Sequence, residues 1–137
     1  MSNFARPGAI LNIGATDSRE IVAATRRGIA VGAVDEIIRS GRATLAEIDR
    51  IVLPRKTLSH RRKIGVLTPE QSDRLVRLAR VVAAAEETFG SQEKAARWLR
   101  RPTTALDDEA PLSLLDTSEG SRQVEQLLGM IDHGLAA

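Results

Sequence analysis

The 137-residue sequence has no cysteine and no tyrosine, and it has only one tryptophan and two phenylalanines. Without cysteine the chain can form neither a disulfide framework nor a thiolate metal site. No apolar run approaches the roughly 20 residues that a membrane-spanning helix needs. The first residues, MSNFARPGAILNIG, lack the basic segment and long apolar core of a secretory signal. These absences predict a soluble, cytoplasmic protein that does not enter a membrane.

Charge is unevenly distributed, although the net charge is only +2. Residues 1–101 hold 19 lysines and arginines against 11 acids, a net charge of +8. Residues 102–137 hold one arginine against seven acids, a net charge of −6. A basic body with an acidic end indicates that the two parts bind different partners, and the basic part suits a polyanion.

Hydrophobic residues recur at helical spacing and do not alternate strictly, so we predict an all-α fold. Capping residues such as Asp17, Thr44, Thr68 and Ser91, with glycines and prolines at the other ends, mark the helix limits. One short helical turn is expected in the loop PTTALDDEAPLSLLDT. The predicted helices span about 18–27, 34–40, 45–52, 54–63, 69–89, 92–101 and 118–133.

The segment RKTLSHRRK, residues 55–63, is strongly basic, and no acid occurs between Pro54 and Pro69. Before it comes a short helix in which Leu45, Ile48 and Ile51 are expected to face inward, and within it Leu58 lies at buried spacing. Two short helices joined by a tight turn predict a helix-turn-helix, whose second helix enters the major groove of DNA. An exposed polar helix without a ligand is the alternative that this segment leaves open.

The chemistry of the second helix suits that role, because arginine and lysine neutralise phosphates while polar side chains near the helix start can reach base edges. The predicted DNA-binding residues are Arg55, Lys56, Thr57, Ser59, His60, Arg61, Arg62 and Lys63.

A series of short motifs runs from the basic segment to the end of the chain. They are Thr57-Leu58 with Arg61, Ser72-Asp73-Arg74, Arg77-Leu78-Ala79-Arg80, Trp98-Leu99 before Pro102, Pro111-Leu112 with Leu115, Thr117 and Gly120, and His133-Gly134. In this order they resemble the Xre/MbcA/ParS antitoxin family over most of the chain, more weakly before residue 40.

The resemblance implies an Xre-like helix-turn-helix bundle in residues 1–67, a connecting helix in 68–90 that can join two copies, and a small helical toxin-binding domain in 91–137. It also implies an antitoxin of a type II toxin-antitoxin pair that represses its own operon. The implied target is a RES-domain toxin, an enzyme that consumes NAD, whose active site the antitoxin occludes. The expected partners are this toxin, operator DNA and a second copy of the chain.

The sequence departs from the family pattern in the loop before the last helix. Asp107 and Asp108 stand where such sequences usually carry two glycines, and Thr103 stands where asparagine is usual. If the loop needs positive φ, aspartate tolerates it better than most residues, at some cost. With Glu109, the two aspartates are also suited to basic residues around a toxin pocket built for NAD phosphates.

The predicted toxin-binding residues lie in the last 40 residues. Trp98 is expected either to anchor the core or to form an interface hot spot. His133 is expected to cap the last helix, and the residues after it form a small tail able to enter a concave active site. The full set is Trp98, Arg101, Thr103, Asp107, Asp108, Leu114, Asp132, His133, Gly134, Leu135, Ala136 and Ala137.

No catalytic triad, glycine-rich phosphate loop or metal-ligand spacing is present, so no enzyme activity, cofactor or metal is expected. The apolar face of the basic helix is too short to bury in lipid. Two other functions stay open: a stand-alone helix-turn-helix repressor without a toxin, and a pure inhibitor that no longer binds DNA.

Overall fold

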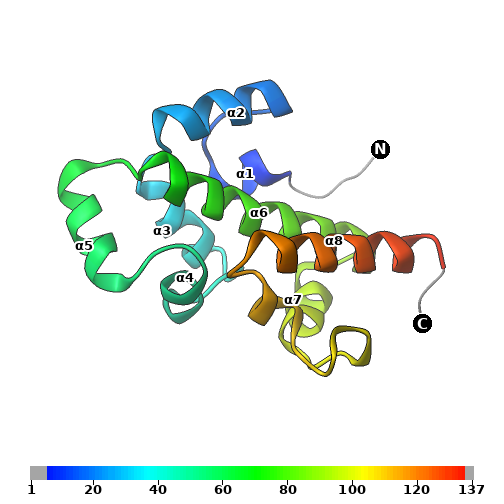
Figure 1. Ribbon diagram of the computed structural model, residues 1–137. Helices are drawn as coiled ribbons and strands as arrows, with labels where there is room; N and C mark the ends of the chain where they lie inside the picture. Colours follow the sequence, from blue (N-terminus) through cyan, green and yellow to red (C-terminus); the bar gives the residue numbers. More distant parts are fainter. Residues whose placement is uncertain (1–5, 135–137) are drawn as a thin grey trace.

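A computed structural model describes residues 6–134 (Figure 1). Within this range the fold is all-α, as predicted, and pairing of the strand type is limited to two isolated bridges, Ala30 with Val66 and Thr103 with Glu109. The elements in chain order are α1 (Pro7–Leu11), α2 (Ser18–Arg27), α3 (Gly32–Arg39), α4 (Leu45–Ile51), α5 (Arg55–Ile64), α6 (Pro69–Phe89), α7 (Gln92–Arg100), the 3-10 turns η1 (Thr104–Leu106) and η2 (Pro111–Leu114), and α8 (Ser118–Asp132).

Five helices, α2, α4, α6, α7 and α8, start at a local side-chain cap, and the first four of these caps are the predicted ones. Each capping oxygen accepts a hydrogen bond from the backbone N–H three residues later, which satisfies a donor that the helix itself cannot pair. In α4 and α6 the third helical residue, Glu47 or Gln71, returns a bond to the cap and completes a capping box. The capping residues are Asp17, Thr44, Thr68, Ser91 and Thr117.

The long helix α6 lies at the centre of the fold and contacts α1, α2, α4, α7 and α8. Figure 1 shows α1 and α2 on one side of it and α8 running beside its second half. Its Leu75, Leu78, Val81 and Ala85 have no exposed surface. They belong to one hydrophobic cluster that extends from α1 to α8, so the helices before and after α6 share a single core.

Four local features differ from the prediction. Helix α1 was missed because five residues are too few for a recognisable period; it forms where Ile10 and Leu11 pack into the core. Leu45, the first residue of α4, is 39% exposed and does not face inward. Pro54 precedes α5 as its N-cap and lies outside the first turn. The loop before α8 also holds two 3-10 turns where one was expected.

Candidate functional sites

Helices α4 and α5 form the predicted pair, joined by a turn over residues 52–54. Val52 and Leu53 are buried in this turn, and Asp49 of α4 accepts a 2.7 Å hydrogen bond at Oδ1 from the backbone N–H of Arg55. On α5 the buried residue is Leu58, which is 3% exposed. Figure 1 shows α5 at one end of the molecule, away from α8. The helix is therefore fixed at its start and along one line, and its remaining surface faces solvent.

The predicted DNA-binding residues of α5 do not all have the same environment. Arg55, Lys56, Ser59, His60, Arg62 and Lys63 are exposed, whereas Thr57 and Arg61 are half-buried. Arg61 donates from Nε to the carbonyl oxygen of Val66 at 2.8 Å, which ties the side chain to the segment that follows its helix.

Arg62 is also engaged within the protein. Its two terminal nitrogens donate to the carboxylate oxygens of Asp35, on α3, at 2.9 and 2.8 Å. The hydrogen bonds to Asp35 raise the pKa of Arg62. The basic segment has no acid of its own, but the fold supplies one from 27 residues earlier in the chain. Exposed pairs of this kind are weak, typically about 0.2–1 kcal/mol, so a phosphate can compete for Arg62.

The predicted toxin-binding residues lie around the loop between α7 and α8 and at the end of α8. Arg101, Asp107 and Asp108 are exposed, and Thr103 and Leu114 are half-buried. At the end of α8, Asp132, His133 and Gly134 are exposed. Leu135, Ala136 and Ala137 lie outside the described residues.

Trp98 is a core residue in this structure. It is 6% exposed, and its ring lies 5.2 Å from that of Phe89, centroid to centroid, with the planes tilted by 40°. Such tilted aromatic pairs add about 0.5–1.5 kcal/mol beyond the burial of area. Only a small part of its surface is left for a partner to touch.

The loop conformation explains the two aspartates. Asp107 and Asp108 adopt φ of 55° and 65°, in the left-handed region where glycine is favoured. Asp107 follows η1 as its C-cap, and the backbone N–H of Asp108 donates to the carbonyl of Thr103 at 3.0 Å. The loop does require positive φ at both positions, and both residues are exposed.

His133 caps α8, as predicted. Its ring atom Nδ1 lies 2.7 Å from the carbonyl oxygen of Gly129, one of the last carbonyls of the helix. The same carbonyl also accepts the backbone N–H of His133 at 3.2 Å, so a ring N–H adds a second hydrogen bond to it at the end of the helix.

Residues that sequence reasoning missed link the two parts of the chain. Arg100, at the end of α7, binds Glu47 of α4, and the buried Glu86 of α6 binds Arg42, which precedes α4. Neither pair was predicted, because no local pattern signals a partner more than 40 residues away.

No helix within residues 6–134 is long and apolar enough to cross a membrane. Over the same stretch, no three or more histidine and acidic side chains come together in a way that could hold a metal ion.

Comparison with known proteins defines the class of this two-part molecule. Residues 20–80 match the antitoxin Xre-like helix-turn-helix domain, and residues 84–134 match the antitoxin Xre/MbcA/ParS C-terminal toxin-binding domain. The protein is therefore an antitoxin with a helix-turn-helix DNA-binding domain.

Similar proteins point the same way. An "Antitoxin Xre" of Yersinia enterocolitica is 36% identical over 118 residues, which cover 84% of this chain and 80% of that protein. An "Antitoxin Xre" of Pseudomonas putida is 37% identical over 108 residues, which cover 78% of this chain and 67% of that protein. A "Prs ADP-ribosylating antitoxin" of a Sphingobium species is 35% identical over 80 residues, which cover 52% of this chain and 50% of that protein. The chain belongs to the Xre/MbcA/ParS antitoxin family.

Proposed function

We propose that this antitoxin represses its own operon through α5 and silences an NAD-consuming RES-domain toxin by occluding its active site. The observation that carries the proposal is the separation of two unlike surfaces. The basic helix α5 lies at one end of the molecule, and the end of α8 lies at the other (Figure 1). One chain can then hold DNA and a second protein at the same time without steric conflict.

On the DNA side, Arg55, Lys56 and Ser59 are the first choice for contacts in the major groove. They lie in the first half of α5 and are exposed. Thr57 and His60 lie beside them, and Lys63 follows at the end of the helix. Arg61 and Arg62 are proposed to act mainly on the backbone phosphates, after giving up weak contacts within the protein.

On the toxin side, the proposed surface combines the loop at 101–109 with the end of α8. The exposed Asp107, Asp108 and Glu109 place negative charge where a pocket for NAD phosphates would be basic. Trp98 supports this surface from inside, and Leu114 adds partly exposed apolar area. The tail from Asp132 to the end of the chain is proposed to enter the pocket.

The name of the Sphingobium relative bears on the substrate. It refers to ADP-ribosylation, a reaction that takes its ADP-ribose from NAD. A toxin that degrades NAD and one that transfers ADP-ribose both need a pocket for NAD, so a single occlusion mechanism serves both. We place the protein and its toxin in the cytoplasm, as a regulator without catalytic activity, and expect it to act as a homodimer within a larger complex.

The deciding experiment is coexpression with the neighbouring reading frame. Copurification of a RES-domain protein, together with loss of its NAD consumption in the complex, is the expected result. If nothing copurifies while the chain still binds its upstream promoter, it is a stand-alone repressor. If the toxin copurifies but the promoter is not bound even at low salt, the chain is an inhibitor only.

A further inference from the structure

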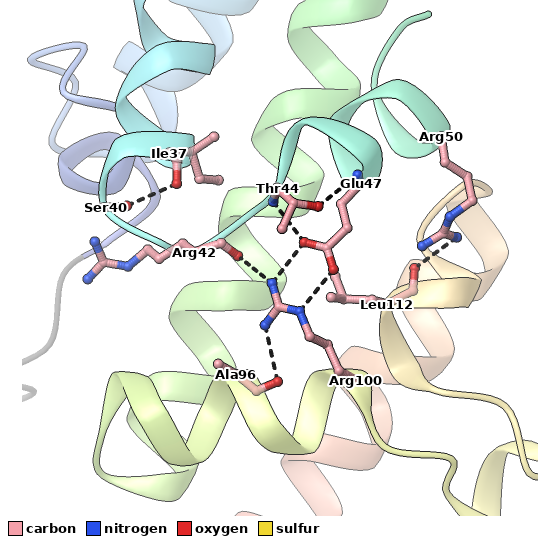
Figure 2. Close-up of polar contacts among 9 residues, drawn as sticks. All are labelled: Ile37, Ser40, Arg42, Thr44, Glu47, Arg50, Ala96, Arg100 and Leu112. Atoms are coloured by element: carbon pink, nitrogen blue, oxygen red, sulfur yellow. Dashed lines mark hydrogen bonds and ion pairs between the residues drawn. The ribbon is translucent and has the colours of Figure 1, made fainter.

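Arg100 joins the toxin-binding region to the helix-turn-helix region. Figure 2 shows its guanidinium facing α4, where Nε and Nη2 donate to the two carboxylate oxygens of Glu47 at 2.9 and 2.8 Å. It also donates to the carbonyl oxygens of Arg42, at 3.4 Å, and Ala96, at 3.2 Å. The Glu47 side chain is 15% exposed and that of Arg100 is 33% exposed, so the pair is partly shielded from water.

Glu47 has a second role at the start of α4. Its Oε1 accepts a 2.9 Å hydrogen bond from the backbone N–H of Thr44, while its own N–H donates to the Thr44 hydroxyl at 3.1 Å. The same carboxylate therefore closes the capping box and receives the guanidinium. Because α4 has only seven residues, it depends on its cap and its neighbours more than on its own helical bonds.

The protonation of Glu47 reflects these bonds. Burial alone would raise the pKa of its carboxyl, but the hydrogen bonds from Arg100 and from the Thr44 backbone outweigh it, and the pKa is lowered. The carboxylate is thus charged at neutral pH, which is the form that the guanidinium holds most strongly.

Helix α4 passes this constraint to α5. Asp49, two residues after Glu47, accepts the backbone N–H of Arg55 at the first residue of α5. One turn after Glu47, Arg50 reaches the carbonyl oxygen of Leu112 in η2 at 3.5 Å (Figure 2). Contacts from α7 and η2 therefore hold the helix that fixes the start of α5.

We propose that Arg100, which lies in the part of the chain matched to toxin binding, is a positioning residue for DNA recognition. It holds Glu47 and so sets α4, and α4 sets the angle and start of α5. This inference rests on the proposed function, in that α5 is the helix that binds DNA.

The test compares this pair with a matched pair elsewhere. Arg80 and Glu125 are joined at 2.8 Å and link α6 to α8, and within residues 6–134 neither side chain makes a polar contact with α4 or α5. Full-length Arg100→Gln, Glu47→Gln, Arg80→Gln and Glu125→Gln chains are titrated against a labelled duplex of the upstream promoter, with fluorescence anisotropy as the signal. We expect Arg100→Gln and Glu47→Gln to bind about tenfold more weakly. The control variants retain the affinity of the unmodified chain.

The Glu47→Gln chain distinguishes an effect on the position of α5 from an effect of charge on DNA binding. Removing a negative charge should strengthen DNA binding if electrostatics alone mattered, whereas loss of positioning weakens it. The double variant should be no worse than either single one, because both remove the same interaction. Arg100→Lys keeps the charge without the two-pronged geometry, so its affinity should lie between those of the unmodified chain and Arg100→Gln. Toxin binding should be unchanged in all of these variants.

Two results would overturn the inference while leaving the proposed function intact. One is a Glu47→Gln chain that binds the duplex as tightly as the unmodified chain, or more tightly. The other is an equal loss of affinity in the Arg80→Gln control. If the unmodified chain ignores the duplex even at low ionic strength, DNA binding by α5 fails and this inference fails with it.

Discussion

Replacing both Asp107 and Asp108 by glycine should stabilise the fold while weakening toxin binding. Both residues are held at φ between 55° and 65°. A left-handed conformation costs an ordinary residue roughly 1–2 kcal/mol, and glycine avoids this cost but loses about 0.5–1 kcal/mol of chain entropy on folding. The balance is about 0.5–1 kcal/mol for each position, or about 1–2 kcal/mol for the pair. Aspartate tolerates this region better than most residues, so the gain should fall toward the lower end.

For a chain of this length, that gain corresponds to a rise in Tm of roughly 3–8 °C. Differential scanning calorimetry measures it on the isolated antitoxin. Asp107→Asn with Asp108→Asn is the matched control, because asparagine keeps the tolerance for positive φ and removes only the charge. The control should leave Tm close to that of the unmodified chain.

Toxin affinity gives the second readout, by isothermal titration with the purified toxin. If the carboxylates face a basic pocket, the glycine and asparagine pairs should both bind more weakly, and lysine at the two positions should bind more weakly still. An unchanged Tm in the glycine pair would refute the reasoning about backbone strain. Unchanged toxin affinity after charge reversal would refute the role of the charges.

Four further outcomes are expected. Glu86→Gln should lower the free energy of unfolding by about 3 kcal/mol in a urea titration, because it leaves the half-buried Arg42 without its carboxylate partner; a loss near zero would contradict this. Deleting residues 134–137 should weaken toxin inhibition in an NAD-consumption assay without changing Tm; inhibition equal to that of the full-length chain would indicate that the antitoxin binds the toxin away from its active site. Arg62→Ala should lower the slope of log affinity for DNA against log salt by about one, as expected for one lost phosphate contact; an unchanged slope would place this side chain away from the DNA backbone. Since the pKa of Glu47 is lowered from 4.5, its contribution to stability should be present at neutral pH and disappear as pH falls below that value, and the Glu47→Gln chain should lack this loss.

Helix limits and the location of the basic helix follow from residues close together in the sequence. Thr44 with Glu47, and Thr68 with Gln71, close hydrogen bonds over three residues, so their spacing alone predicts where α4 and α6 begin. Leu58 likewise predicts the buried line of α5. The helix α1 escaped detection because packing of Ile10 and Leu11, not a local pattern, stabilises five residues.

The sequence by itself determined the helical fold, the helix starts and the basic character of α5, because these depend on bonds within a turn or on charge that any fold would carry. Only the tertiary structure decided which charges far apart in the chain are paired. It brought Asp35 to Arg62 across 27 residues and Glu47 to Arg100 across 53. The physical reason is that an ion pair between distant residues forms only after core packing has brought their helices together. No local pattern in the sequence predicts such a contact.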